Sequence, residues 1–190
     1  MLASLFLETA YSFSGSNITM DTLFDHARKV GADTLVLTDR RMHGAYKFYT
    51  RCAENNITPV LGVQVDAAPF FKDVPLKLIV YAKSEKGYFN LLKLSTMNTV
   101  YGPLELNAIS EHLKDTSIVI NTLEGEMAAL NLEGQDTAVK TITHEVFSLD
   151  TDVYVGVAPE LDDPTDERLL PLDRTFYLHP SQQPVFEALC

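Results

Sequence analysis

The sequence predicts an α/β fold built on a mainly parallel sheet. Strand-like runs rich in Val, Ile and Leu alternate with segments whose apolar residues recur every three to four positions. This alternation is typical of parallel strands joined by helical crossovers. With 190 residues, 46% of them hydrophobic, the chain has enough apolar material for one domain, or for a large lobe and a small one.

The first third of the chain predicts three strands and two helices. An apolar run at 3–7 opens the chain, and a polar, glycine-containing loop follows at 12–19. A helix is expected next, because its apolar residues share one face: Met20, Leu23, Phe24, Ala27 and Val30. Thr19 or Asp21 can cap this helix, and Gly31 can end it. Buried strands follow at 34–38 and 58–66, and an apolar stripe over 42–53 predicts the helix between them.

The rest of the chain continues this alternation. Strands are expected at 76–82, 117–121, 153–157 and 175–178, and helices at 88–95, 104–113, 124–130, 137–149 and 182–189. The polar residues 131–136 indicate a loop or small insertion. Two prolines and four acids over 158–166 indicate an exposed loop that leads into a weak helical turn. Periodicity alone does not separate a closed barrel from an open sheet, and the chain has neither a Gly-x-Gly-x-x-Gly nor a Walker motif.

The composition argues against DNA and membranes as partners and indicates the cellular compartment. The net charge of −11 and the pI of 4.8 predict no direct DNA binding, because an acidic surface repels phosphates. No apolar run approaches the ~20 residues of a membrane helix, so no membrane association is expected. The two cysteines, Cys52 and Cys190, form neither a disulfide framework nor a metal motif. We therefore expect a cytoplasmic protein with Cys52 buried in a helix.

Four short blocks, at 4–12, 37–46, 59–65 and 173–178, carry a resemblance to a known family. In order and spacing they resemble the polymerase-and-histidinol-phosphatase (PHP) domain at the start of bacterial DNA polymerase III alpha subunits. The segment 82–95 is the most specific, since Ala-Lys-x-x-x-Gly-Tyr-x-Asn-Leu-x-x-Leu is characteristic of the polymerase members of the family. The resemblance implies a distorted TIM-like (β/α)7 barrel with metal ligands at the carboxyl ends of its strands, and a single PHP-like domain over 1–190.

The residues at the metal-ligand positions depart from the family pattern. The family has His-x-His, Thr-Asp-His, Gly-x-Glu and Asp-x-His in the four blocks. This chain has Phe6, Glu8, Asp39, Arg40, Gln64, Arg174 and Phe176 at those positions. Phenylalanine has no lone pair to offer, arginine stays protonated, and the Gln64 side chain offers only a neutral carbonyl. We therefore expect no bound metal, no cofactor and no catalytic residue, and treat these seven positions as the remains of a metal cleft.

Each of these residues also has an ordinary structural interpretation. Phe6 and Phe176 lie in apolar strands and are expected to fill the core. Glu8 and Asp39 either bind one weak cation or, as we prefer, form ion pairs with Arg40 or Arg174. The histidines lack metal-site spacing and are expected to be surface or capping residues: His26, His43, His112, His144 and His179. Three serines around Gly15 are expected to be loop residues: Ser12, Ser14 and Ser16.

Three functions remain open at this point. The first is a degenerate, metal-free PHP domain that serves as a structural or interaction module of a DNA polymerase III alpha subunit, whose parent chain is a DNA-directed DNA polymerase (a nucleotidyltransferase). Its expected partners are the polymerase domains downstream in that chain, with other replisome subunits as further candidates. The second is a stand-alone metal-dependent phosphoesterase or exonuclease of the PHP superfamily. The third is an unrelated barrel or sheet enzyme, for which the sequence shows no catalytic constellation.

Overall fold

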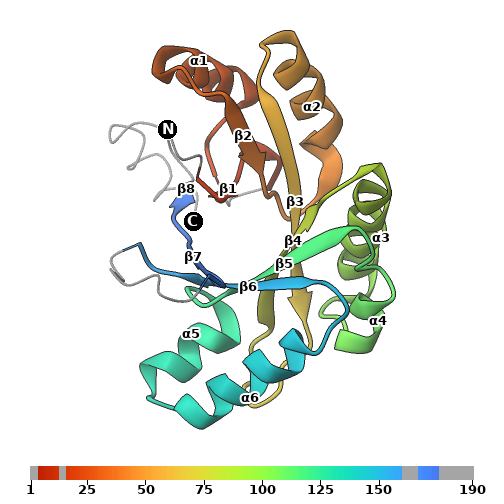
Figure 1. The fold of residues 1–190 in the computed structure, drawn as a ribbon, viewed down its shortest axis with the longest axis vertical. Helices are drawn as coiled ribbons and strands as arrows, with labels where there is room; N and C mark the ends of the chain where they lie inside the picture. Colours follow the sequence, from red (N-terminus) through yellow and green to blue (C-terminus); the bar gives the residue numbers. More distant parts are fainter. Residues whose placement is uncertain (1–3, 13–15, 160–166, 176–190) are drawn as a thin grey trace. The chain divides into compact units, whose positions relative to one another are not determined.

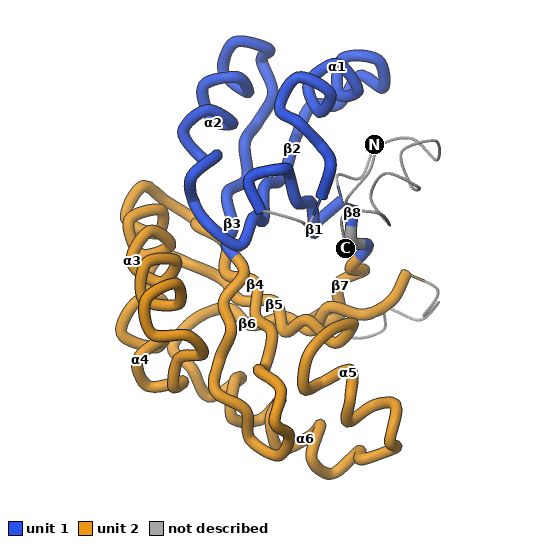
Figure 2. Tube along the Cα trace, turned by 180° about the vertical axis from the view of Figure 1, so that it is seen from behind, with its two compact units in different colours: residues 1–63, 173–190 blue, residues 64–172 orange. Residues whose placement is uncertain are grey.

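The computed structural model describes residues 4–12, 16–159 and 167–175, and the chain divides into two compact units. Unit 1 comprises residues 1–63 and 173–190, and unit 2 comprises residues 64–172 (Figure 2). Strands and helices alternate in both units (Figure 1), which confirms the predicted α/β class. Among the described residues, no helix combines the length and the apolar character that crossing a membrane requires.

Unit 1 contains two pairs of parallel strands with helices beside them. Its elements are β1 (Phe6–Leu7), the 3-10 helix η1 (Ala10–Ser12), α1 (Met20–Val30), β2 (Thr34–Leu37), the 3-10 helix η2 (Met42–Gly44), α2 (Ala45–Glu54), β3 (Thr58–Ala67) and β8 (Arg174–Thr175). Strand β1 pairs with β8, and β2 pairs with the first half of β3, both in parallel. Strand β3 continues beyond Val63 into unit 2.

Local sequence explains the ends of α1. Thr19 is its N-cap, and the side chains and backbone amides of Thr19 and Thr22 form a reciprocal capping box. Gly31 ends the helix with φ of 64°, a left-handed conformation that glycine adopts without steric cost. The buried face of α1 packs on α2, where the rings of Phe24 and Phe48 lie 6.0 Å apart. Cys52 is buried on α2, as predicted, and its burial raises the pKa of the thiol to about 12.

Unit 2 contains the remaining strands and helices. They are β4 (Leu76–Ala82), α3 (Glu85–Tyr101), α4 (Leu106–Ser110), β5 (Thr116–Asn121), α5 (Gly125–Leu132), α6 (Asp136–Phe147), β6 (Asp152–Val157) and β7 (Leu169–Pro171). The order of the six-stranded sheet is β2-β3-β4-β5-β6-β7, and β1 and β8 form a separate two-stranded sheet. The pairs β5–β6 and β6–β7 are parallel, whereas β4–β5 is antiparallel.

The antiparallel pair departs from the prediction, and the connection between its strands explains it. Ala82 at the end of β4 pairs with Thr116 at the start of β5, so the chain leaves and re-enters the sheet at the same edge. Helix α3 carries the chain away from this edge, and residues 102–115 bring it back. The backbone amide of Lys83 donates to the carbonyl of Asp115 at 2.9 Å, which fixes this return.

The 82–95 motif shapes this connection. A Cβ atom at position 87 would lie 2.1 Å from the Asp115 carbonyl oxygen, so only glycine fits where the returning chain crosses the start of α3. The Asn90 side-chain amide donates to the Lys114 carbonyl at 2.9 Å, and Leu91 and Leu94 are buried in the core. The residues that carry the family resemblance therefore hold the crossover in place.

The predicted loop within 131–136 is confirmed, but it comprises only residues 133–135, because α5 extends to Leu132 and α6 already begins at Asp136. One other prediction for unit 2 was wrong. The weak helical turn after the acidic loop is replaced by strand β7, whose three residues pair with β6. A strand of three residues is too short to show hydrophobic periodicity in the sequence. Its pairing with β6 determines its extended conformation. The expected helix at 182–189 and most of the 175–178 strand lie outside the described residues.

Candidate functional site

The carboxyl ends of two strands of unit 1 lie side by side. The Leu7 carbonyl, at the end of β1, accepts hydrogen bonds from the backbone amide of Thr38 at 2.9 Å and from its hydroxyl group at 3.0 Å. The acidic residues that follow, Glu8 and Asp39, are both buried. Two of the predicted site residues therefore lie in one region, just beyond the strand ends.

The chain's own donors bind both oxygens of the Asp39 carboxylate. The Thr9 backbone amide and the Ser12 hydroxyl group donate to Oδ1, each at 2.7 Å, and the Thr9 hydroxyl group donates to Oδ2 at 2.7 Å. A carboxylate offers about four acceptor positions. Three of them are filled here, including both on Oδ1.

The short helix η1 places these donors. Its i to i+3 geometry puts Thr9 and Ser12 on one side of the turn, and the Ser12 amide donates to the Thr9 carbonyl at 2.9 Å. The Ser12 Oγ also accepts a hydrogen bond from the Arg40 backbone amide at 3.1 Å. That bond directs the hydroxyl proton of Ser12 toward Asp39. Segments 9–12 and 38–40 are thereby joined through one carboxyl group.

Burial controls the titration of Asp39. It raises the pKa of the carboxyl group from 3.8 to about 6, and the negative charge of Glu8 adds to this rise. The hydrogen bonds from Thr9 and Ser12 act in the opposite direction, since they favour the charged form, but they only partly offset the cost of burial.

Arg40 or Arg174 was predicted to pair with a buried carboxylate, and Arg40 does not do so. Arg40 is exposed, and the ion pairs formed among the described residues do not include its side chain. The hydroxyl and amide donors satisfy Asp39 without the cost of burying a guanidinium group beside it. The Arg174 side chain and Phe176 lie outside the described residues, so the other half of that prediction stays open.

The remaining predicted positions are placed as follows. Phe6 is fully buried in β1, and the β1–β8 register sets it opposite the backbone of Arg174. Gln64 is buried in β3 and belongs to unit 2. Whether these positions once formed a single metal cleft stays a prediction.

Thr9 and Ser12 were not predicted as residues of this site. Ser12 was expected to be only a loop residue, yet its side chain is buried and binds Asp39. The available signal was the position of Asp39 directly after a buried strand, because a carboxyl group there needs donors from a neighbouring strand end. The spacing of Thr9 and Ser12 alone did not identify them as those donors.

The described residues around Asp39 do not fit a metal centre. No group of three or more His, Cys, Asp or Glu side chains within 4–12, 16–159 and 167–175 is arranged to hold a metal ion. Phe6 is apolar, and Asp39 already binds three donors. Histidine, which supplies most ligands in the family pattern, is absent from the described residues of all four blocks except for His43, which is exposed.

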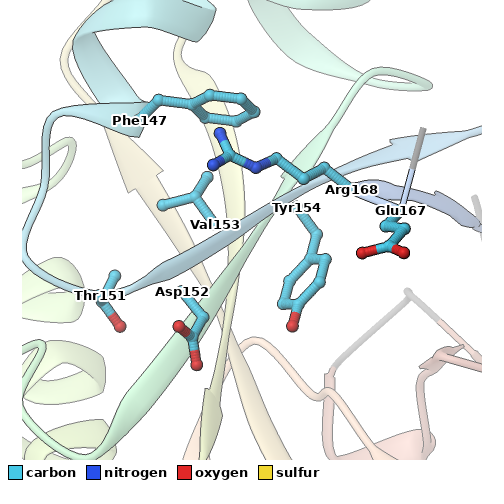
Figure 3. A pocket seen from close by; sticks show the side chains of 7 residues that line it. All are labelled: Phe147, Thr151, Asp152, Val153, Tyr154, Glu167 and Arg168. Carbon is cyan, nitrogen blue, oxygen red and sulfur yellow. The ribbon is translucent and has the colours of Figure 1, made fainter.

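Unit 2 contains a separate surface pocket of about 290 Å³ (Figure 3). Its lining residues are Phe147, Thr151, Asp152, Val153, Tyr154, Glu167 and Arg168. The Arg168 guanidinium lies 4.8 Å from the centre of the Phe147 ring, and Asp152 pairs with Lys83 at 2.8 Å. The pocket contains none of the predicted site residues, and its charges of both signs define no single ligand chemistry.

Comparisons with known proteins agree with the resemblance seen in the sequence. The PHP domain family matches residues 5–157. A DNA polymerase III subunit alpha from Streptococcus pyogenes serotype M3 is 35% identical over 121 residues, which cover 63% of this chain and 11% of that protein. The corresponding protein of Mycoplasma genitalium is 29% identical over 123 residues, 65% of this chain and 14% of its own length. The chain thus spans about a tenth of the curated relatives it matches.

A solved structure of an amidohydrolase from Chromobacterium violaceum aligns with 98% of this chain and 96% of its own, at 13% identity and a TM-score of 0.48.

Proposed function

Because the chain belongs to the PHP domain family, we propose that it is a metal-free member that serves a DNA polymerase III alpha subunit as a structural module. In this proposal the cleft that holds metal ions in the family pattern is closed by hydrogen bonds and an aromatic side chain. The chain carries no catalytic residue of its own, and nucleotidyl transfer belongs to other parts of the parent polymerase.

The observation that supports this proposal most directly is the coordination of Asp39. A metal ligand must offer a lone pair, and both positions of Oδ1 accept hydrogen bonds from Thr9 and Ser12. At Oδ2 one position accepts from the Thr9 hydroxyl group. This leaves a single acceptor position, on Oδ2, for a divalent ion, and Arg40 and Phe6 supply no further ligand.

Metal analysis and activity assays test the loss of the site. The purified protein is expected to contain far less than one zinc or manganese ion per chain by elemental analysis. With added Mn²⁺ or Zn²⁺, it is expected to hydrolyse neither a phosphate monoester nor the ends of single-stranded DNA. Stoichiometric metal, or turnover that disappears in Asp39→Ala, would contradict the proposal and support the alternative of a metal-dependent phosphoesterase or exonuclease.

We further propose that the chain's partners are polymerase domains of the same parent protein and other replisome subunits, in the cytoplasm. The support is that the matched relatives are DNA polymerase III alpha subunits and extend far beyond the matched segment. Reading the gene that encodes this sequence tests the assignment. We expect a long continuation with clustered aspartates suited to nucleotidyl transfer, and a stop codon directly after Cys190 would contradict it.

A further inference from the structure

The segment 40–51, which we call the basic segment, concentrates positive charge in an acidic protein. The whole chain has 15 Lys and Arg residues against 26 Asp and Glu residues. The basic segment has four cations, Arg40, Arg41, Lys47 and Arg51, and no acid. The net charge of −11 therefore conceals a local excess of the opposite sign.

Three of the four cations are available to a ligand. Arg40, Arg41 and Lys47 are exposed, and the ion pairs among the described residues leave these three side chains out. Arg51 is already engaged, because it pairs with Asp21 at 2.8 Å and lies 5.2 Å from the centre of the Phe24 ring.

Two exposed tyrosines lie on α2, the helix that also carries Lys47. The exposed fraction is 78% for Tyr46 and 54% for Tyr49. The two residues are three positions apart, so they lie on the same side of the helix. The core-facing side of α2 is formed by other residues, namely Ala45, Phe48 and Cys52. Figure 1 shows α2 beside β2 and β3 in unit 1.

The nearby acids leave this surface positive. Asp21 on α1 is paired with Arg51, and Asp25 on the same helix is paired with Arg28. Asp39 is buried beneath the start of the segment and accepts hydrogen bonds from Thr9 and Ser12. Glu54, exposed at the C-terminal end of α2, is the acid nearest in sequence after the segment.

We propose that Arg40, Arg41, Tyr46, Lys47 and Tyr49 form a contact surface for single-stranded nucleic acid. Cations bind the phosphate backbone, and exposed aromatic rings stack on unpaired bases, which is the combination used for single strands. Duplex DNA presents its bases to each other and not to a tyrosine ring. An acidic peptide could use the cations, but it has no base to stack on Tyr46 and Tyr49.

The acidic composition predicts no direct DNA binding, and this surface would be a local exception to that prediction. The acidic remainder of the protein still repels extended polyanions, so a contact of a few nucleotides is expected and a long binding track is not. The inference does not depend on the proposed structural role, because it rests on charge and exposure in α2 and on the residues that precede it.

Fluorescence anisotropy with a labelled thymidine oligomer of about 12 nucleotides tests the proposal. We expect saturable binding that weakens with salt, with a slope of about −2 in log K against log salt for three phosphate contacts. Tyr46→Ala is expected to weaken binding about fivefold or more, the effect of losing one stacked base. Lys47→Glu is expected to weaken binding and to make the salt slope shallower.

Matched controls separate this surface from general charge and exposure. Lys29→Glu reverses an exposed lysine on α1 of the same unit, and Phe89→Ala removes an exposed aromatic residue from α3. Neither control is expected to change binding. Absence of binding, or equal losses in Lys47→Glu and Lys29→Glu, would overturn the proposal. Equal affinity for a duplex, or preferential binding of poly-glutamate with the same dependence on Lys47, would also overturn it.

Discussion

Asp39 carries its carboxyl group in a buried position, and this makes the stability of the fold depend on pH. The folded-state pKa of about 6 lies above the value of 3.8 expected for an unfolded chain. The folded protein therefore binds the Asp39 proton more tightly than the unfolded protein does. The stabilising contribution of the Asp39 carboxyl group is complete below about pH 4 and is lost as the pH rises through 6.

Asp39→Asn tests this dependence. The amide keeps the shape of the side chain and removes its titration. The difference in free energy of unfolding between wild type and variant is expected to shift by about 2 kcal/mol between pH 4 and pH 7 in favour of the variant. Urea denaturation at several pH values measures it. A difference that stays constant with pH would show that Asp39 titrates normally.

Glu126 is a second buried carboxylate, and it organises a loop of unit 2. The side chain is fully buried and accepts hydrogen bonds from three consecutive backbone amides, those of Phe70 at 3.0 Å, Phe71 at 2.5 Å and Lys72 at 2.9 Å. These bonds hold the loop between β3 and β4, where the rings of Phe70 and Phe71 stack at the surface.

Glu126→Ala is expected to destabilise the protein by about 2–4 kcal/mol, because three amides lose a charged acceptor at once. Hydrogen exchange of the amides at 70–72 is expected to accelerate in the same variant. Glu133→Ala is the control, since it removes a solvent-exposed carboxylate that pairs with Lys72. Unchanged exchange at 70–72 in Glu126→Ala would show that other contacts hold the loop.

At the scale of elements, the β4–α3–α4–β5 connection depends on one close approach. The returning chain passes the first turn of α3 where residue 87 has no side chain, and Asp115 takes a left-handed conformation with φ of 60°. Because this crossing brings β5 back to the edge where β4 ends, it also sets the antiparallel pairing of the two strands.

Gly87→Ala is expected to cost about 3 kcal/mol or more, above the usual range for an added methyl group, since the contact is with backbone and not with a flexible side chain. Gly134→Ala is the comparison. That glycine has φ of 66° but open space around its Cβ position, so only the conformational cost of roughly 1–2 kcal/mol applies. Equal losses in chemical denaturation would indicate that the connection moves to accommodate the methyl group added at position 87.

At the scale of the whole molecule, the sequence predicted the element types well and the pairing less well. Hydrophobic periodicity located β4 at 76–82 and α1 with its caps, because these elements are long and have clear end signals. It missed β7, which is too short to show a period. It also missed the antiparallel pairing, because strand direction depends on the path of the connection and not on the strand's own residues.

The candidate site, like the sheet, could be predicted only in part from the sequence. Asp39 and Glu8 could be predicted as neighbours, because each follows a strand end and the family pattern links them. The hydrogen-bond donors to Asp39 could not be predicted from the sequence. An arginine and a hydroxyl group can both satisfy a buried carboxylate, and the choice depends on three-dimensional position, which the turn from Thr9 to Ser12 provides.

The way Glu126 holds its loop has a consequence for sequence variation. All three of its donors are main-chain amides, which every residue except proline possesses. The side chains at 70, 71 and 72 can therefore change without loss of these bonds, while position 126 requires a carboxylate. The loop can thus acquire new surface chemistry by mutation at its tip, and one distant residue preserves its backbone shape.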